Sequence, residues 1–518
     1  MNPEKILKRF NAAKSRKSIW EETYREAMEY AAPQRETFDE EFKGQRKDGS
    51  ENNIFDSTAQ EALSRFVNNL QSSLVPPMRK WISLNPGVVI QNESDKRRIH
   101  EILNQVCELL FAKLRRSNFD TQIAESFFDL GFGTGALLVF KGTKEIPFRF
   151  ANVPLSQLYI EEGPHQRVDT AFRRFKLSAR NIQQQWPDAK IGKELLECIA
   201  EKPDMECEFI EMTTPSKINS LNKTTKQLEE VNGFTYYVLE KKTNTVIVER
   251  TMKTSPWIIF RWSNLPGEIY GRGPVLTALP DIKSLNTTKR LLLQAASIAT
   301  FGMYTVTDDV NTSNVKFGAA AMINVRSNGG GMAGPSIAPL VTNTRPDLSQ
   351  MVIQDLQNSI SKIMFGDPLG DVNLPVKTAT EVSIRQQELS KRIGSAYGKL
   401  QYELIQPLTK RLLDIMYELE LIPDDLTETG ELISIEPMSP LATAQDEEDV
   451  VKHIRYVETL VGLFGPEIGL AMINPEKFGK LIADKMTINP EIPITEEQAQ
   501  QIRQTAAQVA GAQQNAAQ

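Results

Sequence analysis

Residues 274–300 read PVLTALPDIKSLNTTKRLLLQAASIAT, and residues 346–364 read PDLSQMVIQDLQNSISKIM. In both stretches apolar side chains recur at intervals typical of a helix, from Leu276 to Ile298 in the first and from Val352 to Ile363 in the second. This spacing gathers the apolar side chains on one helical face. The sequence therefore predicts two helices that flank residues 301–345.

Residues 301–345 differ from both flanking helices in composition. They are rich in Gly, Ala, Asn and Thr, contain the run Asn328-Gly-Gly-Gly331, and carry almost no charge. Two short runs of branched and aromatic residues, Tyr304–Val306 and Met322–Val325, are typical of strands. We expect a compact β-type insertion between the two helices.

A loop rich in Gly, Pro and Asp, Gly366–Asn373, follows the second helix, and a helix-capable run then extends from Thr380 to about Leu421. Pro407 lies inside this run. Proline lacks the backbone N–H, and its ring clashes with the preceding turn, so we expect the helix to kink or split near Leu404–Gln406.

The rest of the chain divides into helices and strands. Helical spacing of apolar residues predicts helices at about 6–31, 58–74, 94–116 and 120–130. Between Ala136 and Trp262 the period becomes strand-like, in short runs rich in branched and aromatic residues. The predicted fold class is therefore α+β and predominantly helical.

Composition narrows the possible chemistry of the 518-residue chain, which has three cysteines and three histidines. Three cysteines, none in a Cys-x-x-Cys pair, favour a reducing, intracellular setting. Histidine is the commonest general base and metal ligand, so its scarcity disfavours zinc enzymes and Ser-His hydrolases. Because no run reaches about 18 consecutive apolar residues, we expect a soluble protein that is synthesised in the cytoplasm and does not insert into a membrane.

The net charge of −6 conceals a division along the chain. From Leu421 to Gln518 there are 16 acidic and 6 basic residues, so the preceding part of the chain carries a small positive charge. The acidity is therefore concentrated in the C-terminal region, which ends in a tail rich in Gln and Ala.

Gly131-Phe-Gly-Thr-Gly-Ala136 fits the spacing of a dinucleotide-binding fingerprint. That fingerprint requires a strand before the glycines and a helix after them, because the helix N-terminus must face the pyrophosphate. Here a helical stretch comes first and the strand Ala136–Phe140 follows, which favours a helix-to-strand turn.

Two runs of carboxylates, Asp308-Asp309 and Asp446-Glu-Glu-Asp449, lack the spacing of a calcium loop and favour solvated acidic faces. The sequence also contains no G-x-x-x-x-G-K-[ST] phosphate loop. We therefore predict no catalytic residue, no bound metal ion and no cofactor.

The order of the predicted elements indicates assembly. A monomer has little use for long helices with so much small and apolar surface, whereas in a ring each copy packs its helices against the next. The sequence therefore favours a ring-forming subunit.

Four passages resemble the portal, or head-to-tail connector, proteins of short-tailed bacteriophages. Their order and spacing match over about residues 5–480. The passages are Asn53-Ile-Phe-Asp-Ser-Thr-Ala59 with the helix that runs to Leu74-Val-Pro-Pro77 and Trp81, Leu130–Val139, Tyr270-Gly-Arg-Gly-Pro274 with Pro280–Asn286, and Thr378-Ala-Thr-Glu-Val382.

The resemblance implies a structural protein of the virion, present as a ring of about twelve copies at one capsid vertex, for packaging and ejection of the viral genome. The implied partners are further copies of the chain, double-stranded DNA that passes without sequence specificity, the terminase large subunit, tail adaptor and nozzle proteins, and the scaffold and major capsid proteins.

The family's elongated subunit has wing, stem, clip and crown regions, which the resemblance places along this chain. They would be the wing at 1–273, the stem helices at 274–300 and 346–365, the clip at 301–345, the tunnel loop at 366–377, a long kinked helix joining wing and crown at 378–440, and the acidic crown with its Gln/Ala-rich tail at 441–518.

The resemblance also implies candidate site residues. If the long helices line the channel, Lys283, Lys289 and Lys362 are candidates for transient contacts with DNA phosphates, and exterior or intersubunit ion pairs are the alternative. Other functions left open are a nucleotide- or metal-dependent DNA-processing enzyme and a membrane-inserted pore. The tunnel loop that would narrow the channel consists of Gly366, Asp367, Pro368, Leu369, Gly370, Asp371, Val372 and Asn373.

Overall fold

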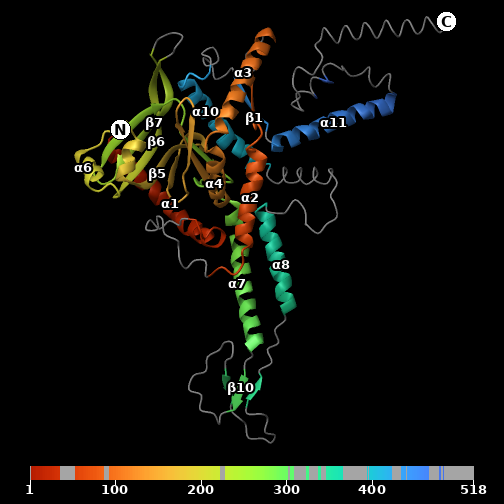
Figure 1. Ribbon diagram of the computed structural model, residues 1–518. Helices are drawn as coiled ribbons and strands as arrows, with labels where there is room; N and C mark the ends of the chain where they lie inside the picture. Colours follow the sequence, from red (N-terminus) through yellow and green to blue (C-terminus); the bar gives the residue numbers. More distant parts are fainter. Residues whose placement is uncertain are drawn as a thin grey trace, which may run out of the picture. The chain divides into compact units, whose positions relative to one another are not determined.

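The computed structural model confirms an α+β, predominantly helical fold (Figure 1). Its described residues form two compact units. The first comprises Met1–Gln71, Glu108–Gly370 and Gly398–Glu428, and the second comprises Ser72–Cys107, Asp371–Tyr397 and Thr429–Gln518. The structure describes residues 2–35, 53–86, 93–221, 228–301, 304–307, 322–325, 337–339, 346–365, 394, 396–422, 433–438, 440–465, 478–479 and 482.

Two antiparallel sheets form the centre of the first unit. In the larger sheet the strands follow chain order, β4-β5-β6-β7-β8, and in the smaller sheet β2 lies between β3 and β9. All of the strand-like runs predicted between Ala136 and Trp262 are present. The strands are β2 (Thr134–Lys141), β3 (Phe148–Asn152), β4 (Leu158–Glu162), β5 (Val168–Ser178), β6 (Glu206–Leu221), β7 (Leu228–Glu240), β8 (Thr245–Met252) and β9 (Trp257–Arg261).

Helix α1 (Pro3–Ala31) forms where its apolar spacing predicts a helix, and it covers one face of the larger sheet. Ile6, Phe10 and Ala13 are buried against Tyr159 and Phe172, and the Phe10 and Tyr159 rings lie 5.0 Å apart. Alternate residues of the strands form a second core that includes short helices α5 (Ile182–Gln185) and α6 (Lys193–Glu201).

The predicted helix pair is present in the first unit as α7 (Pro274–Phe301) and α8 (Pro346–Ile363), which lie side by side (Figure 1). Both predicted strands of the insertion form, as β10 (Tyr304–Thr307) and β11 (Met322–Val325). A third strand that we did not predict, β12 (Ile337–Pro339), pairs antiparallel with β10.

The helix that contains Pro407 is interrupted where its sequence predicts a break. A π-helical turn, η4 (Gln401–Ile405), precedes α10 (Gln406–Glu418). The helix ends at Glu418, so the helical part of the 378–440 region is shorter than expected. Residues 380–393 lie outside the described residues.

The second unit contains a two-stranded antiparallel sheet, β1 (Ile82–Pro86) and β13 (Ile433–Pro437), and the helix α11 (Pro440–Phe464). Strand β13 corrects the expectation of helix up to residue 440. Most of helix α2 (Thr58–Leu74) belongs to the first unit, and α3 (Glu93–Leu114) is divided between the two units at Cys107. Helix α4 (Phe119–Phe132) belongs to the first unit and precedes β2 of the smaller sheet.

Candidate functional site

Two glycine-containing motifs meet at the point from which α7 emerges. Gly133 follows α4 with φ +145°, and its carbonyl accepts a hydrogen bond from the Trp262 amide at 3.0 Å. The Gly273 amide, one residue before α7, donates to the Phe132 carbonyl at 3.0 Å. The run that resembles a dinucleotide fingerprint is therefore a helix-to-strand turn, as its order predicts.

The two glycine motifs approach so closely that side chains are excluded. A Cβ on Gly133 would lie 2.0 Å from the Gly271 carbonyl oxygen, and a Cβ on Gly271 would lie 2.1 Å from the Gly133 oxygen. The Tyr24 hydroxyl of α1 donates to the Gly271 carbonyl at 2.9 Å, and the Gly271 amide donates to Thr134 Oγ1 at 2.9 Å. We call this contact between residues 131–134 and 271–273 the glycine clasp. It fixes the start of α7 to the sheet.

Asp56 joins α2, α7 and α8. Its carboxylate accepts hydrogen bonds from the Thr58 amide at 2.8 Å, from Lys289 Nζ at 2.8 Å and from Gln357 Nε2 at 3.0 Å. Burial alone would raise the pKa of Asp56, but the hydrogen bonds from Lys289, Thr58 and Gln357 lower it below its ordinary value. A carboxylate in the Asn53–Ala59 motif therefore stays charged and connects the helix pair to the rest of the first unit.

Neighbouring residues of the same motif hold α7 as well. Asn286 Oδ1 accepts from the Phe55 amide at 2.7 Å, and Asn286 Nδ2 donates to the Asn53 carbonyl at 2.9 Å. Between the two helices, Ser359 donates to Asp281 at 2.9 Å. Three of the four motifs that carry the family resemblance thus converge on α7.

The end of α8 is fixed by aromatic side chains. Phe365 has φ 53° and packs against Trp262 and Phe66, with ring centroids 5.5 and 6.4 Å away. The Phe365 carbonyl also accepts from Asn69 Nδ2 at 3.1 Å. Residue 366, where the predicted tunnel loop begins, therefore follows an anchored position.

The three lysines predicted to contact DNA lie in three different environments. Lys283 forms an ion pair with Glu26 of α1, and Lys289 is bound to Asp56. Lys362 is exposed in the last turn of α8. Both ion pairs join residues of one chain. The Lys283–Glu26 pair is exterior, with each side chain 41% exposed, whereas Lys289 is paired with a buried carboxylate. The loop Gly366–Asn373 and the motif Thr378–Val382 lie outside the described residues.

Sequence reasoning did not single out Asp56. Its local signal is an Asx turn, in which Oδ1 accepts from the amide of Thr58 two residues later. Its other partners, Lys289 and Gln357, are hundreds of residues away in the sequence. The same holds for Arg261, a buried arginine whose guanidinium donates to Glu403 at 2.7 Å.

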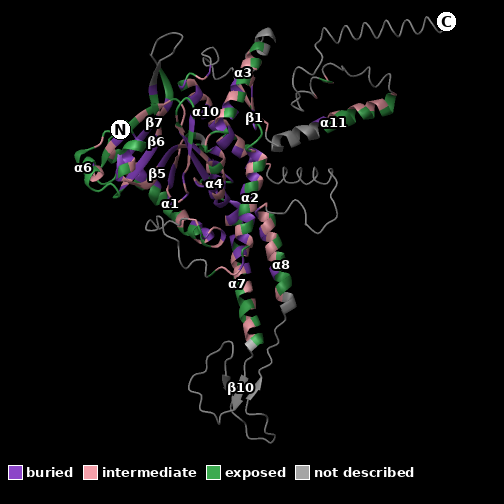
Figure 2. Ribbon diagram, viewed as in Figure 1, coloured by how far each residue is buried: buried purple, intermediate pink, exposed green. Residues whose placement is uncertain are grey.

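Burial changes abruptly along α7 (Figure 2). Val275, Ala278, Ile282 and Leu285 are buried, whereas every residue from 286 to 300 is half-buried or exposed. The helix therefore has a half embedded in the first unit and a half that is covered on one side by α8.

Two further structural findings concern the described residues alone. They contain no group of three or more His, Cys, Asp or Glu side chains that could hold a metal ion. Across the described helices, none combines the length and the apolarity needed to cross a bilayer.

Comparison with known proteins defines the class to which this protein belongs. Residues 3–493 match the family model described as bacteriophage head to tail connecting protein, and the chain belongs to this family. The predicted resemblance to head-to-tail connectors is confirmed.

Two curated relatives that match nearly the whole chain are both named as portal proteins. The "Probable portal protein" of Bordetella phage BPP-1 is 22% identical over 533 residues, which cover 99% of this chain and 92% of that protein. The "Portal protein" of Salmonella phage epsilon15 is 24% identical over 546 residues, which cover 98% and 92%.

Among solved structures, a chain from "Virion of native gene transfer agent (GTA) particle" matches with 10% identity and a TM-score of 0.33, covering 81% of this chain and 89% of that one.

Proposed function

We propose that this connector is a portal: a ring of about twelve copies at one capsid vertex, through which double-stranded DNA is packaged and later ejected. Membership of the head-to-tail connecting family and the names of both relatives support the proposal. The proposal assigns no catalytic step to the chain.

The exposed apolar surface on the outer half of the helix pair is the observation that supports a ring. From Leu291 to Phe301 α7 has no charged residue, and Leu291 and Leu293 are 55% and 52% exposed. On α8, Met351 and Val352 are 71% and 50% exposed. A helix that is apolar on most sides requires cover, and a neighbouring copy supplies it if the α7 face of one subunit packs on the α8 face of the next.

The sparse positive charge of the helix pair agrees with a channel for DNA. Each phosphate neutralised by Lys or Arg adds affinity, so a channel that lets DNA slide should offer few free cations. Lys283 and Lys289 are already paired with Glu26 and Asp56, which leaves Lys362 as the strongest candidate of the three for a transient phosphate contact.

The remaining regions follow from the same proposal. Residues 1–273 form the wing, α7 and α8 the stem, residues 301–345 the clip, residues 366–377 the tunnel loop, and residues 441–518 an acidic crown. The clip is the docking site for the terminase large subunit during packaging and for tail adaptor and nozzle proteins afterwards, and scaffold and major capsid proteins surround the ring.

Sedimentation velocity tests whether the helix pair forms the ring. Wild-type chain should sediment as one large oligomer, and Leu291→Glu with Met351→Glu should reduce the large species at least tenfold, because two charges would enter an apolar contact. Leu196→Glu, on exposed α6, is the matched control. A large oligomer that survives the double substitution at the same concentration would contradict the proposed interface.

A further inference from the structure

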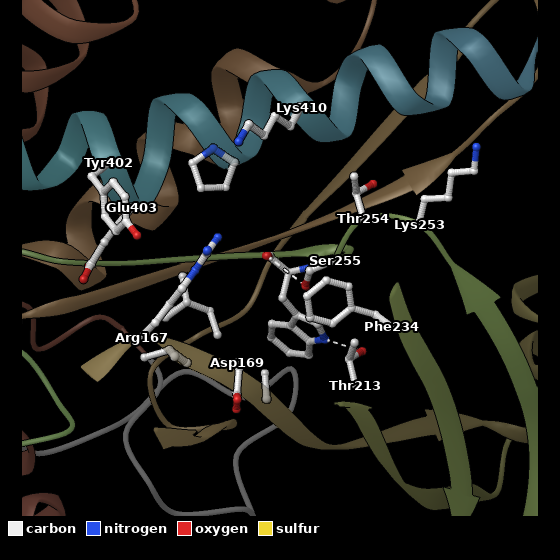
Figure 3. A pocket seen from close by; sticks show the side chains of 15 residues that line it. Arg167, Asp169, Thr213, Phe234, Lys253, Thr254, Ser255, Tyr402, Glu403 and Lys410 are labelled. Carbon is white, nitrogen blue, oxygen red and sulfur yellow. Dashed lines mark hydrogen bonds between the residues drawn. The ribbon is translucent and has the colours of Figure 1, made fainter. Parts of the chain in front are cut away.

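A recess of about 310 Å³ lies in the first unit between the larger sheet and the helix η4–α10 (Figure 3). It has no role in the contacts that hold α7 and α8. Its walls come from β5, β6, β7, β9, the β8–β9 turn and the helix. The side chains that face it include Arg167, Phe234, Trp257, Tyr402 and Lys410.

Three cations (Arg167, Lys253 and Lys410) and two carboxylates (Asp169 and Glu403) line the recess, so positive charge is in excess by one. In Figure 3 the Arg167 guanidinium points into the space between the sheet and the helix, and Lys410 approaches from the helix. Among the described residues, neither side chain forms an ion pair with a carboxylate. Both are exposed, so both are available to an anion from outside.

The nearest carboxylate of the helix is already neutralised. Glu403 accepts from Arg261 Nη2 at 2.7 Å and from the Arg261 backbone amide at 2.8 Å. Arg261, which is nearly fully buried, also donates to the Gln166 carbonyl at 3.1 Å. One buried cation thus balances Glu403 and fixes the residue that precedes Arg167. Arg167 itself lies over the Tyr402 ring, 5.8 Å from its centroid, and is not paired with Glu403.

Two backbone irregularities border the recess. Gln166 has φ 59°, a conformation that non-glycine residues rarely adopt. The π-helical turn Gln401–Ile405 presents Tyr402 and Glu403 to the recess, and Pro407 follows. Strained residues and π-helical turns concentrate at functional sites, so their coincidence at one recess points to binding.

The wall opposite the helix is apolar and rigid. Trp257 is buried and donates from Nε1 to Thr213 Oγ1 at 3.0 Å, which fixes the indole. Phe234 and Ile259 extend the apolar surface. A ligand for this recess therefore combines a carboxylate for Arg167 and Lys410 with an apolar group for Trp257 and Phe234.

We propose that the recess binds the acidic segment Asp446–Val451 of a second copy of this chain. The segment joins four consecutive carboxylates to two valines, and it lies in the C-terminal region that carries 16 acidic and 6 basic residues. Of the two valines, both in α11, Val450 is buried, whereas Val451 is 56% exposed and so is the one available as the apolar group. The inference rests on the proposed ring, because the ring brings copies together.

A nucleic acid fits the recess less well. DNA affinity requires several cations in a row along the backbone, and the recess offers two beside an apolar wall. A recess of about 310 Å³ accommodates one or two side chains, and a duplex presents phosphates on a surface too broad to enter it.

Isotope-coded cross-linking tests the contact in the assembled protein. Copies labelled with ¹⁴N and ¹⁵N are mixed before assembly, treated with a water-soluble carbodiimide that joins lysine to carboxylate, and analysed by mass spectrometry. Cross-links from Lys410 to residues 446–449 should include pairs of mixed isotope. If all such cross-links join residues of one isotope, or if none forms in an intact oligomer, the proposal is wrong.

Peptide binding tests the recess without requiring a ring, so failure of the inference and failure of the proposed function remain distinguishable. The probe is a fluorescent peptide of residues 442–454, and the receptor is full-length chain in which Asp446→Asn, Glu447→Gln, Glu448→Gln and Asp449→Asn remove the competing segment. Anisotropy should show binding that weakens at least tenfold in Arg167→Glu/Lys410→Glu, while Lys202→Glu, an exposed lysine on no wall of the recess, binds as before.

Three results would overturn the assignment. They are equal binding by the double variant with an unchanged thermal unfolding midpoint, equal binding of a peptide with the same residues in scrambled order, and displacement of the peptide by a short DNA duplex in a manner that depends on Arg167.

Discussion

Lys17 is the residue on which α1 departs most from an ordinary amphipathic helix. Its spacing puts it on the apolar face, and it is fully buried, with Nζ donating to the carbonyls of Leu155 and Ser156 at 2.6 and 2.8 Å. Burial lowers the pKa of Lys17 to about 7. Burial also raises the pKa of nearby Asp129 to about 6, against the opposing charge of Arg35. Both groups therefore change charge near neutral pH.

These two groups predict how stability depends on pH. From about pH 4 to 6 folded Asp129 keeps a proton that the unfolded chain releases, so its contribution to the free energy of unfolding falls as pH rises. From about pH 7 to 10 the unfolded chain keeps a proton that folded Lys17 has released, so the contribution of Lys17 rises with pH. Urea denaturation should therefore show a minimum between pH 6 and 7 from this pair.

The variant Lys17→Met should flatten the rise above pH 7, where the slope due to this group is at most about 1.4 kcal/mol per pH unit. Lys14→Met, on the exposed side of the same helix, is the matched control. An unchanged slope in Lys17→Met would show that Lys17 does not titrate in this range.

The glycine clasp predicts an unusually costly glycine-to-alanine change. In Gly271→Ala the new Cβ would meet the Gly133 carbonyl at 2.1 Å, and backbone cannot yield as a flexible side chain does. We expect a loss of about 3 kcal/mol in the free energy of unfolding, the upper end of the cost of overpacking. Gly398→Ala, where a Cβ meets nothing within 4 Å, should stabilise its helix by about 0.5–1 kcal/mol. Similar midpoints for both variants in thermal unfolding would refute the clasp.

Among the elements, the helix pair depends on Asp56. Asp56→Ala removes acceptors for Thr58, Lys289 and Gln357 together, and we expect the free energy of unfolding to fall by about 2–4 kcal/mol. Hydrogen exchange should accelerate in residues 286–300 of α7. Asp355→Ala, on the exposed side of α8, is the control. Unchanged hydrogen exchange in α7 after Asp56→Ala would show that Asp56 does not hold the helix pair in place.

Elements defined by local pattern were predictable from sequence. The spacing from Ile6 to Ala31 gives α1, and Pro407 marks the π-helical turn that ends at Ile405, because helical period and proline act over a few residues. The order of helix and strand around Gly133 likewise sufficed to exclude a dinucleotide site.

Elements and contacts that depend on distant residues were not predictable. Strand β13 pairs with β1 across most of the chain, and each strand has only five residues, too few for a clear period. The links from Asp56 to Lys289 and from Arg261 to Glu403 also join remote segments. Charge alone does not identify such partners, since the sequence contains 60 basic and 66 acidic residues.

The proposed tunnel loop makes a prediction at the same scale. We expect particles whose portal lacks residues 366–373 to package DNA and then lose it, because the loop would no longer narrow the channel. Packaged DNA protected from nuclease, measured over time against particles with the intact loop, reports retention. Normal retention by the deletion variant would refute this role for the loop.

At the scale of the whole molecule, the uneven distribution of charge along the chain has its proposed effect only when copies assemble into the ring. The C-terminal region, with 16 acidic and 6 basic residues, would repeat about twelve times and form a strongly acidic crown beside packaged DNA. Repulsion between this crown and the phosphates would keep the DNA from adhering to the portal.

Electron microscopy of the purified chain tests the central claim most directly. The portal proposal predicts class averages of a closed ring of about twelve copies, with a central hole wide enough for a DNA duplex. A chain that remains a monomer, or that forms a closed particle without a hole, at concentrations where the protein is folded would contradict it.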